Sequence, residues 1–376
     1  MSLLGVSGSL ANELGGAVSG FLKNPLTRSF FLYYYLPAAA FLLIQGLWIA
    51  PVVGLPALDI SGFEFHANPE TTGLTQLLTD LAVSFFSLNV ILLLFAPLAV
   101  GGLTGMLNLQ ITKFFEGLLP IEKPFLRRWL QRNKQLSEKL YGPLDRKRKE
   151  YLRAPREMGK DGDQALALAA EIQELHVAIE ESNADRSLPT DPNRVTPTAL
   201  GNALAIAEEY PFERYGIDAV LFWPRLRAEV PPELLAGLDG TKGVLDGMLN
   251  VTLLAYVFGL EAIVVGLVRP FVKIADAASP GALWLIVAGI LSFLVGWMSY
   301  RAGVSAARSM GGQLQIFFDY YRGKVLERFG LALPDDLAQE KVIWLRLAAF
   351  LRRGEPFYFP AEARAPKKKK EKDEEE

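Results

Sequence analysis

The sequence predicts an all-α, polytopic membrane protein with about four transmembrane helices and a helical domain that faces water. Its apolar residues gather in long blocks: residues 29–58, 81–112 and 277–300 contain no charged side chain, and residues 247–268 contain one, Glu261. A hydrocarbon core about 30 Å thick is crossed by roughly 20 apolar helical residues. Outside these blocks, no stretch alternates like a β-strand over a useful length.

Aromatic side chains mark the ends of two of the blocks. Trp48 lies near the end of the first, and Trp284 and Tyr300 bracket the last. Such rings prefer the headgroup level of a bilayer. The four spans are therefore expected at Phe31–Val53, Val83–Leu107, Leu249–Val268 and Ala282–Tyr300.

The distribution of Lys and Arg predicts the orientation. Residues 54–82 contain four acidic and no basic side chains, whereas residues 113–160 contain fourteen basic ones. Basic residues accumulate on the cytoplasmic side of a membrane. Both termini and the large central segment are therefore expected in the cytoplasm, although Arg269 and Lys273 fall in the expected outer loop.

The chain divides accordingly into six parts. These are a cytoplasmic N-terminal segment, either an interfacial amphipathic helix or a flexible end (1–28), spans one and two with a short outer loop (29–112), a helical cytoplasmic domain (113–248), spans three and four (249–300), a cytoplasmic helical extension (301–360) and a charged tail expected to be disordered (361–376).

The cytoplasmic domain reads as a series of helices. Helical spacing of apolar residues covers 125–153, with a break expected at Tyr141-Gly142-Pro143. Thr196-Pro197 predicts the N-cap and first turn of another helix, which is expected to stop at Tyr210-Pro211. Past span four, the apolar residues of 316–321 are expected to pack on this domain.

A dense basic run lies in the first part of that domain. It consists of Arg146, Lys147, Arg148 and Lys149. One interpretation is that these side chains contact anionic lipids of the inner leaflet. The other is a solvated helix that only satisfies the positive-inside bias.

Residues 196–226 carry the most distinctive motif. It comprises Leu200-Gly201-Asn202, Arg214-Tyr215-Gly216-Ile217-Asp218 and Trp223-Pro224-Arg225-Leu226. The motif resembles one in a set of uncharacterised bacterial multi-pass membrane proteins, over about thirty residues. That set tends to carry Arg where this chain has Ala199. The resemblance implies a bacterial inner membrane and no particular activity.

The motif offers several groups for hydrogen bonds and ion pairs. The candidate residues are Asn202, Arg214, Tyr215, Asp218, Trp223 and Arg225. Carboxylates and Arg side chains form strong bidentate pairs when they are shielded from water. The pairs either lock a helical corner of the domain or line a pocket for a ligand or partner.

Common catalytic and metal-binding patterns are not found. The chain has no cysteine, and its two histidines, His66 and His176, have no second ligand at metal spacing. No phosphate-binding loop and no nucleophile elbow is present. A net charge of −2 argues against a nucleic-acid binder. We therefore expect no cofactor, no metal and no catalytic residue.

Glu261 is the one charged residue inside an expected span. A carboxylate is costly in lipid and should face a helix bundle, a subunit interface or water. It is either a gating or proton-linked group or a structural partner of Asn89 or Gln45. Small residues such as Gly101 and Gly296 permit close helix approach, within one chain or in an oligomer.

Two functions remain open. The first is a non-enzymatic membrane scaffold or regulator, alone, as a homo-oligomer or in a larger complex, whose cytoplasmic domain docks a partner. The second is an oligomeric ion channel or transporter that uses Glu261.

Overall fold

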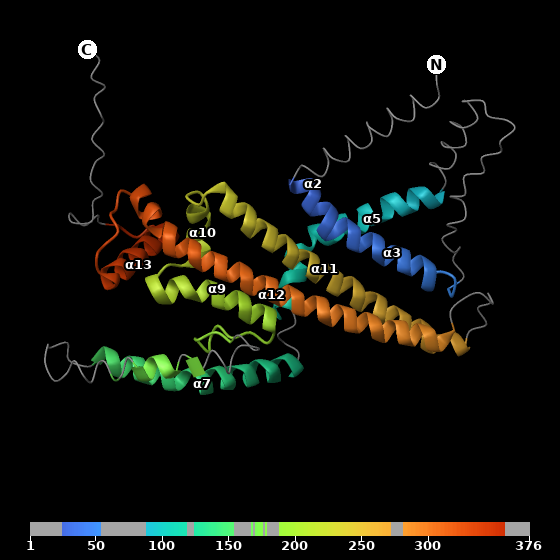
Figure 1. The fold of residues 1–376 in the computed structure, drawn as a ribbon, viewed down its shortest axis with the longest axis horizontal. Coiled ribbons are helices and arrows are strands. Elements are labelled where there is room, and N and C mark those ends of the chain that lie inside the picture. Colours follow the sequence, from blue (N-terminus) through green and yellow to red (C-terminus); the bar gives the residue numbers. More distant parts are fainter. Residues whose placement is uncertain are drawn as a thin grey trace, which may run out of the picture. The chain divides into compact units, whose positions relative to one another are not determined.

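The computed structural model describes residues 25–53, 88–118, 124–153, 188–271 and 281–357, together with part of 167–178. Within these residues all regular secondary structure is helical, which confirms the all-α prediction (Figure 1). The expectations for the N-terminal segment before residue 25 and for the tail after residue 357 lie outside them. The chain forms two compact units: unit 1 is Met1–Lys113 with Gly243–Gly303, and unit 2 is Phe114–Lys242 with Val304–Glu376.

Unit 1 is built from apolar helices. Its elements are α2 (Pro25–Phe30), a π-helical turn (Phe31–Tyr35), α3 (Leu36–Trp48), α5 (Leu88–Met106), most of α6 (Asn108–Phe115), the later part of α11 (Pro232–Val268), a 3₁₀ turn (Arg269–Phe271) and the first part of α12 (Ala282–Arg328). The π-helical turn and α3 both pack against α5.

Glycines allow two of these helices to touch through their backbones. A Cβ atom on Gly259 of α11 would lie 3.0 Å from the carbonyl oxygen of Gly289 of α12, and one on Gly289 would lie 2.8 Å from that of Gly259. Ser292 Oγ also donates to the carbonyl of Ala255 at 2.7 Å. In lipid there is no hydrophobic driving force between helices. They associate instead through close packing at small residues and through hydrogen bonds from hydroxyl groups. At the expected small residues, a Cβ on Gly101 would likewise lie 3.0 Å from the Tyr34 carbonyl.

Three helical stretches in the described residues are long and apolar enough to cross a membrane: Thr27–Trp48, Pro232–Phe271 and Ala282–Arg328. Large apolar side chains such as Leu260, Leu283 and Trp297 are more than half exposed along them. That exposure fits helices whose solvent is lipid, because a soluble protein rarely exposes so much apolar surface.

The second expected span is only partly matched. Its helix is α5, and the apolar part whose side chains the structure describes is Phe95–Met106, too short on its own to cross a bilayer. A count of four spans therefore stays a prediction. The third span begins within a longer helix, because α11 starts at Pro232 rather than near Leu249. The helix that contains the expected fourth span, α12, runs on to Arg328.

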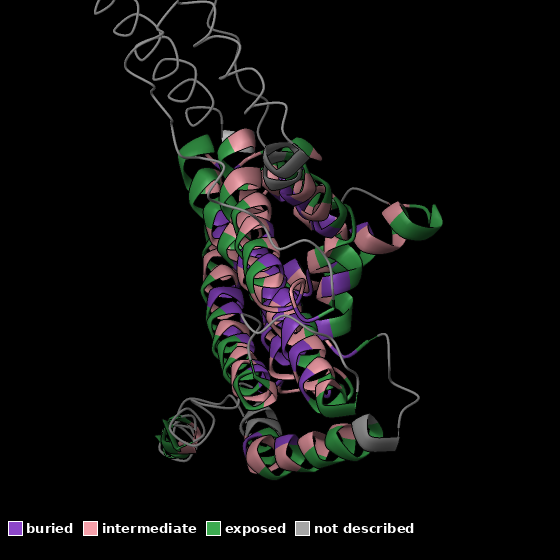
Figure 2. Ribbon diagram, turned by 90° about the vertical axis from the view of Figure 1, so that its right-hand side faces the viewer, coloured by how far each residue is buried: buried purple, intermediate pink, exposed green. Residues whose placement is uncertain are grey.

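Unit 2 has a hydrophobic core of its own. Its helices are α7 (Pro124–Arg153), α9 (Ala199–Tyr215), α10 (Ala219–Arg227), α13 (Leu337–Arg353) and the remaining parts of α6, α11 and α12. Phe222, Trp344 and Leu347 are almost fully buried, and the rings of Phe222 and Trp344 meet edge to face with centroids 4.9 Å apart. Figure 2 shows buried and exposed residues interleaved along the helices.

The expected apolar stripe at 316–321 is partly right. Phe317 and Phe318 are buried in the core of unit 2, and Tyr321 packs against it. Ile316 and Tyr320 are exposed, because they lie on the other side of the helix.

Both helix breaks expected at proline are wrong. Pro143 lies inside α7 and Pro211 inside α9. Proline removes one helical hydrogen bond and strains the preceding turn. Tertiary contacts offset this cost: the neighbouring Leu144 is 1% exposed, and Tyr210 is held by a hydrogen bond to Asp319.

The N-cap of α9 also differs from the prediction. Thr198 is the cap, and its hydroxyl accepts from the Gly201 N–H at 3.1 Å. Thr196 instead donates its hydroxyl to Asn202 Oδ1 at 3.0 Å. The helix therefore starts two residues later than the Thr-Pro pair suggested.

Candidate functional site

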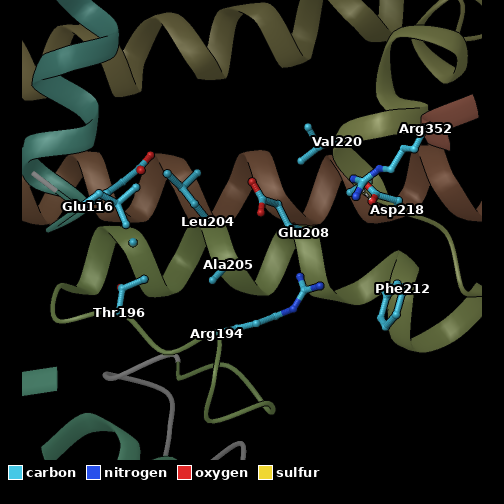
Figure 3. A pocket seen from close by; sticks show the side chains of 13 residues that line it. Glu116, Arg194, Thr196, Leu204, Ala205, Glu208, Phe212, Asp218, Val220 and Arg352 are labelled. Atoms are coloured by element: carbon cyan, nitrogen blue, oxygen red, sulfur yellow. Dashed lines mark hydrogen bonds and ion pairs between the residues drawn. The ribbon is translucent and has the colours of Figure 1, made fainter. Parts of the chain in front are cut away.

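A groove in unit 2 runs along one side of α9, and we name it the α9 groove. It encloses about 530 Å³. Its lining residues are Glu116, Leu118, Arg194, Thr196, Gly201, Leu204, Ala205, Glu208, Phe212, Asp218, Ala219, Val220 and Arg352. Figure 3 shows Glu116 and Thr196 at one end, Asp218 with Arg352 at the other, and Leu204, Ala205 and Glu208 between them.

The floor of the α9 groove is set by glycine. A Cβ on Gly201 would lie 2.4 Å from Thr196 Oγ1 and 2.6 Å from the carbonyl oxygen of Glu116. Gly117 next to it has a φ of 80°, a left-handed conformation that side chains rarely adopt. The end of α6 can therefore approach the start of α9 only with glycine at these positions.

Charged and apolar groups alternate on the walls. Arg352 of α13 forms an ion pair with Asp218, which also caps α10 by accepting from the Leu221 N–H at 3.0 Å. The Arg194 guanidinium lies 5.6 Å from the centre of the Phe212 ring. Val220 is 66% exposed and Phe212 is 45% exposed. The groove thus presents apolar surface bordered by two arginines.

A buried carboxylate fixes the loop that carries Arg194. Glu209 of α9 is 4% exposed and accepts backbone N–H bonds from Thr190 at 3.1 Å and Asp191 at 2.8 Å. Burial raises the pKa of Glu209 from its ordinary value of 4.5 to about 7, although these two N–H bonds act in the opposite direction. The carboxylate therefore titrates near neutral pH while it anchors the loop.

Helix α7 holds the same loop from its other side. Ser137 Oγ donates to the carbonyl of Pro189 at 2.8 Å, and the Tyr141 hydroxyl donates to that of Leu188 at 3.1 Å. Asn133 Nδ2 donates to the carbonyl of Thr196 at 3.0 Å. The loop is therefore ordered by polar contacts along most of its length.

A second polar network joins α9, α12 and α13. Asp319 accepts the hydroxyl of Tyr215 at 2.6 Å and that of Tyr210 at 3.0 Å. Burial, followed by the bond to Asp319, raises the pKa of both tyrosines, so they stay neutral donors. Arg322 bonds Glu340 at 2.8 Å, and Glu340 is 2% exposed.

The motif residues expected to form a site are mostly used in internal contacts. Asn202 accepts from the Thr196 N–H at 2.7 Å, and Arg225 donates to the carbonyl of Leu221 at 2.9 Å. The Arg214 guanidinium lies 5.7 Å from the ring centre of Tyr210. The ring of Trp223 stacks on Phe317 with centroids 6.5 Å apart. Asp218 pairs with Arg352, a residue that the motif does not contain.

In unit 1, the structure brings Gln45 and Glu261 together. Gln45 Nε2 of α3 donates to Glu261 Oε2 of α11. Asn89, the other expected partner, lies in α5, but its side chain is outside the described residues. The carboxylate therefore has a partner from a neighbouring apolar helix.

Sequence reasoning missed a second polar cluster in unit 1. Asp246 and Asn250 of α11 are 8% and 1% exposed. Asn250 Nδ2 donates to the carbonyl of Tyr33 at 3.1 Å, and the Tyr34 hydroxyl donates to Asp246 at 3.4 Å. Asn250 Oδ1 has no hydrogen-bond partner in the described residues. The available signal was the spacing Gly243, Asp246, Gly247, Asn250, which places all four on one helical face.

The residues expected to contact lipid differ among themselves. Lys147 pairs with Glu171 at 2.8 Å and with Glu150 at 3.4 Å. Arg146 is exposed and donates to the carbonyl of Gly142 at 3.3 Å. The side chains of Arg148 and Lys149 lie outside the described residues.

Comparison with known proteins adds no family to these observations. The chain matches no protein-family model, no curated protein and no solved structure. In the part of the chain that the structure describes, no group of three or more His, Asp and Glu side chains could hold a metal ion. The motif resemblance to bacterial membrane proteins stays a prediction.

Proposed function

We propose that this chain is a non-enzymatic membrane scaffold or regulator whose unit 2 docks a protein partner in the α9 groove. The observation that carries the proposal is the groove itself, in which the exposed Val220 and Phe212 lie between Arg194 and Arg352. Protein interfaces combine an apolar centre with a polar rim, and arginine and aromatic residues supply much of their binding energy.

The walls of the groove are held in place before any partner binds. The Asp218–Arg352 pair fixes one end, Glu209 fixes the loop of Arg194, and Gly201 fixes the floor. Binding to a preformed surface avoids the entropy cost of ordering loops and side chains. That supports a docking role better than a catalytic one, which would need an activated nucleophile or base.

The membrane setting supports the same proposal. Three helical stretches fit a bilayer, and the basic side chains of 113–160 favour a cytoplasmic location for the segment that precedes the groove. Together with the motif resemblance, this favours a bacterial inner membrane with both termini inside. The exposed apolar faces of α11 and α12 suit assembly into a homo-oligomer or a larger complex.

Site-specific cross-linking tests this proposal, since the natural chain has no cysteine. Val220→Cys, combined with a thiol-directed cross-linker in intact cells, should give one dominant adduct of defined mass. Phe212→Ala in the same protein should weaken that adduct. Gln339→Cys, exposed on α13, is the matched control and should give none. Recovery of the Val220→Cys protein without any adduct, across several growth conditions, would contradict partner docking in the groove.

The second candidate function is an oligomeric channel or transporter that uses Glu261 as a gating or proton-linked group. The bond from Gln45 gives Glu261 a structural role already, which weakens this alternative. Ion flux through reconstituted vesicles distinguishes the two. A flux that disappears in Glu261→Gln would favour transport, and a flux unchanged by the substitution would remove Glu261 from any mechanism.

A further inference from the structure

Helix α7 has one face committed to unit 2. Asn133, Ser137 and Tyr141 donate hydrogen bonds to the loop of residues 188–196, and Leu144 is 1% exposed. These positions repeat at spacings of three and four, so they lie on one side of the helix. The direction in which α7 faces within unit 2 is therefore fixed.

The opposite face of α7 carries a line of basic side chains, which we name the basic stripe. Its members are Arg128, Arg132, Lys139 and Arg146, at spacings of four, seven and seven, and all four are exposed. Gln135 and Gly142 fill the positions between them, so the stripe contains no acidic residue from Arg128 to Arg146. The spacing of seven continues in the sequence at Arg153, and Glu150, four positions after Arg146, pairs with Lys147.

The basic stripe differs from the other charges of α7 in its ion pairing. Lys147, which lies off the stripe, pairs with Glu150 and Glu171. In the described part of the chain, no carboxylate lies within ion-pair distance of the four stripe residues, and Arg146 bonds only a carbonyl of its own helix. The whole helix contains ten basic and three acidic residues. A counter-charge for the stripe must therefore come from outside these residues.

We propose that the basic stripe of α7 rests on the anionic headgroups of the bilayer in which the apolar helices of this chain lie. Charge complementarity is the first argument, because a straight, acid-free line on a helix meets a planar anionic surface along its full length. Chain continuity is the second: α7 begins at Pro124, nine positions after α6 ends at Phe115. The tether keeps the stripe at a high effective concentration near the membrane.

A protein partner fits the stripe less well. Binding energy at protein interfaces comes mainly from buried aromatic, apolar and arginine anchors. The stripe has no aromatic or apolar side chain among its members, so its attraction is almost purely electrostatic. It should therefore be strongly sensitive to salt.

The absence of cysteine makes a single-site fluorescence experiment clean. Gln135→Cys places a thiol on the stripe without changing charge, and the full chain carrying a fluorophore there is reconstituted into nanodiscs. The discs contain phosphatidylcholine alone or with about one-third phosphatidylserine, together with a headgroup-linked quencher. Quenching should rise several-fold in the anionic discs. It should fall back when salt is raised from about 0.1 M to about 1 M, where the Debye length shrinks from about 10 Å to about 3 Å.

Two double variants distinguish the effect of the stripe charges from the effect of the total charge of α7. Arg132→Gln with Lys139→Gln removes two stripe charges and should abolish most of the lipid-dependent quenching. Arg127→Gln with Lys134→Gln removes the same charge from α7 off the stripe and should retain it. Equal quenching in neutral and anionic discs would overturn the proposal, as would equal loss in both double variants.

This inference does not depend on the α9 groove. The Val220→Cys adduct should persist in Arg132→Gln/Lys139→Gln, so failure of lipid contact and failure of partner docking are distinguishable.

Discussion

Asn250 Nδ2 of α11 donates a hydrogen bond to the carbonyl oxygen of Tyr33 at 3.1 Å, across 217 residues of sequence. The usual helical donor to that carbonyl would be the N–H of residue 37, which is Pro37 and has none. The helix adopts a π turn at Phe31–Tyr35, in which the Leu36 N–H bonds the carbonyl of Phe31. A side chain of one helix therefore supplies the donor that the backbone of another lacks.

Removal of this donor should destabilise unit 1. Asn250→Ala leaves the Tyr33 carbonyl unsatisfied in an apolar setting, which costs about 1–3 kcal/mol. Thermal unfolding in detergent measures the loss. In a Pro37→Ala background the new N–H can bond Tyr33, so the same substitution should cost clearly less. Equal costs in both backgrounds would show that Asn250 does not act through this carbonyl.

Two alanine substitutions on α11 should act in opposite directions. A Cβ on Gly243 would lie 2.2 Å from Tyr33 Cε2, so Gly243→Ala must displace the ring and should destabilise by about 1–3 kcal/mol. Nothing lies within 4 Å of a Cβ on Gly240, where alanine should stabilise by about 0.5–1 kcal/mol through helix propensity. The melting temperatures of the two variants give the test, and a shared sign would contradict the close packing of Tyr33.

Glu209 should make stability depend on pH. Its pKa is about 7 in the folded chain against 4.5 ordinarily, so the folded state binds the proton more tightly. The contribution of Glu209 to stability should therefore be fully present below about pH 4.5 and be lost as pH rises through 7, by at most about 3 kcal/mol. Glu209→Gln cannot titrate and should reduce this slope in denaturant titrations across that window. The neighbouring Glu208, whose pKa burial also raises, should keep a part of it.

Glu233→Gln, which changes an exposed carboxylate near the start of α11, is the control for this prediction. It should keep the slope of the natural chain. If the slopes of the natural protein and Glu209→Gln coincide, the buried carboxylate is not the group that titrates.

The Arg322–Glu340 pair should contribute more to stability than an exposed pair. Glu340→Gln leaves the mostly buried Arg322 without its counter-charge and weakens the bond from Trp344, which should cost about 3–5 kcal/mol. Arg328→Gln breaks the pair with Glu229, in which the arginine is 75% exposed and screened by solvent, and should cost clearly less. Chemical unfolding of both variants measures the difference, and similar losses would argue against burial as its cause.

Composition and local spacing predict much of this fold. Long uncharged blocks predicted the apolar helices. Lipid offers no hydrogen bonds to the backbone, and a helix satisfies its N–H and C=O groups internally. The apolar residues around Phe317 and Phe318 predicted a buried face, which the structure confirms for these two. For Glu261 the sequence suggested two hydrogen-bond partners, Asn89 and Gln45. Gln45 is the donor observed in the structure.

Contacts between distant residues could not be predicted in this way. Arg352 pairs with Asp218 across 134 residues of sequence. The spacing of neighbouring residues therefore could not predict the ion pair at this end of the groove. Pro143 and Pro211 looked like helix ends because local propensity disfavours proline in a helix. The packing of Leu144 and Tyr210 overrides that preference, and packing is known only once the helices are assembled.

The π turn at Phe31–Tyr35 also determines where this segment tolerates a change in length. A π turn holds one residue more than an α-helical turn would, so loss of a single residue there leaves an ordinary helix with both flanks still aligned. Loss of a residue in α3 between the π turn and Gln45 rotates everything beyond it by about 100° and separates Gln45 from Glu261. Natural insertions and deletions in this helix should therefore concentrate at its three consecutive tyrosines.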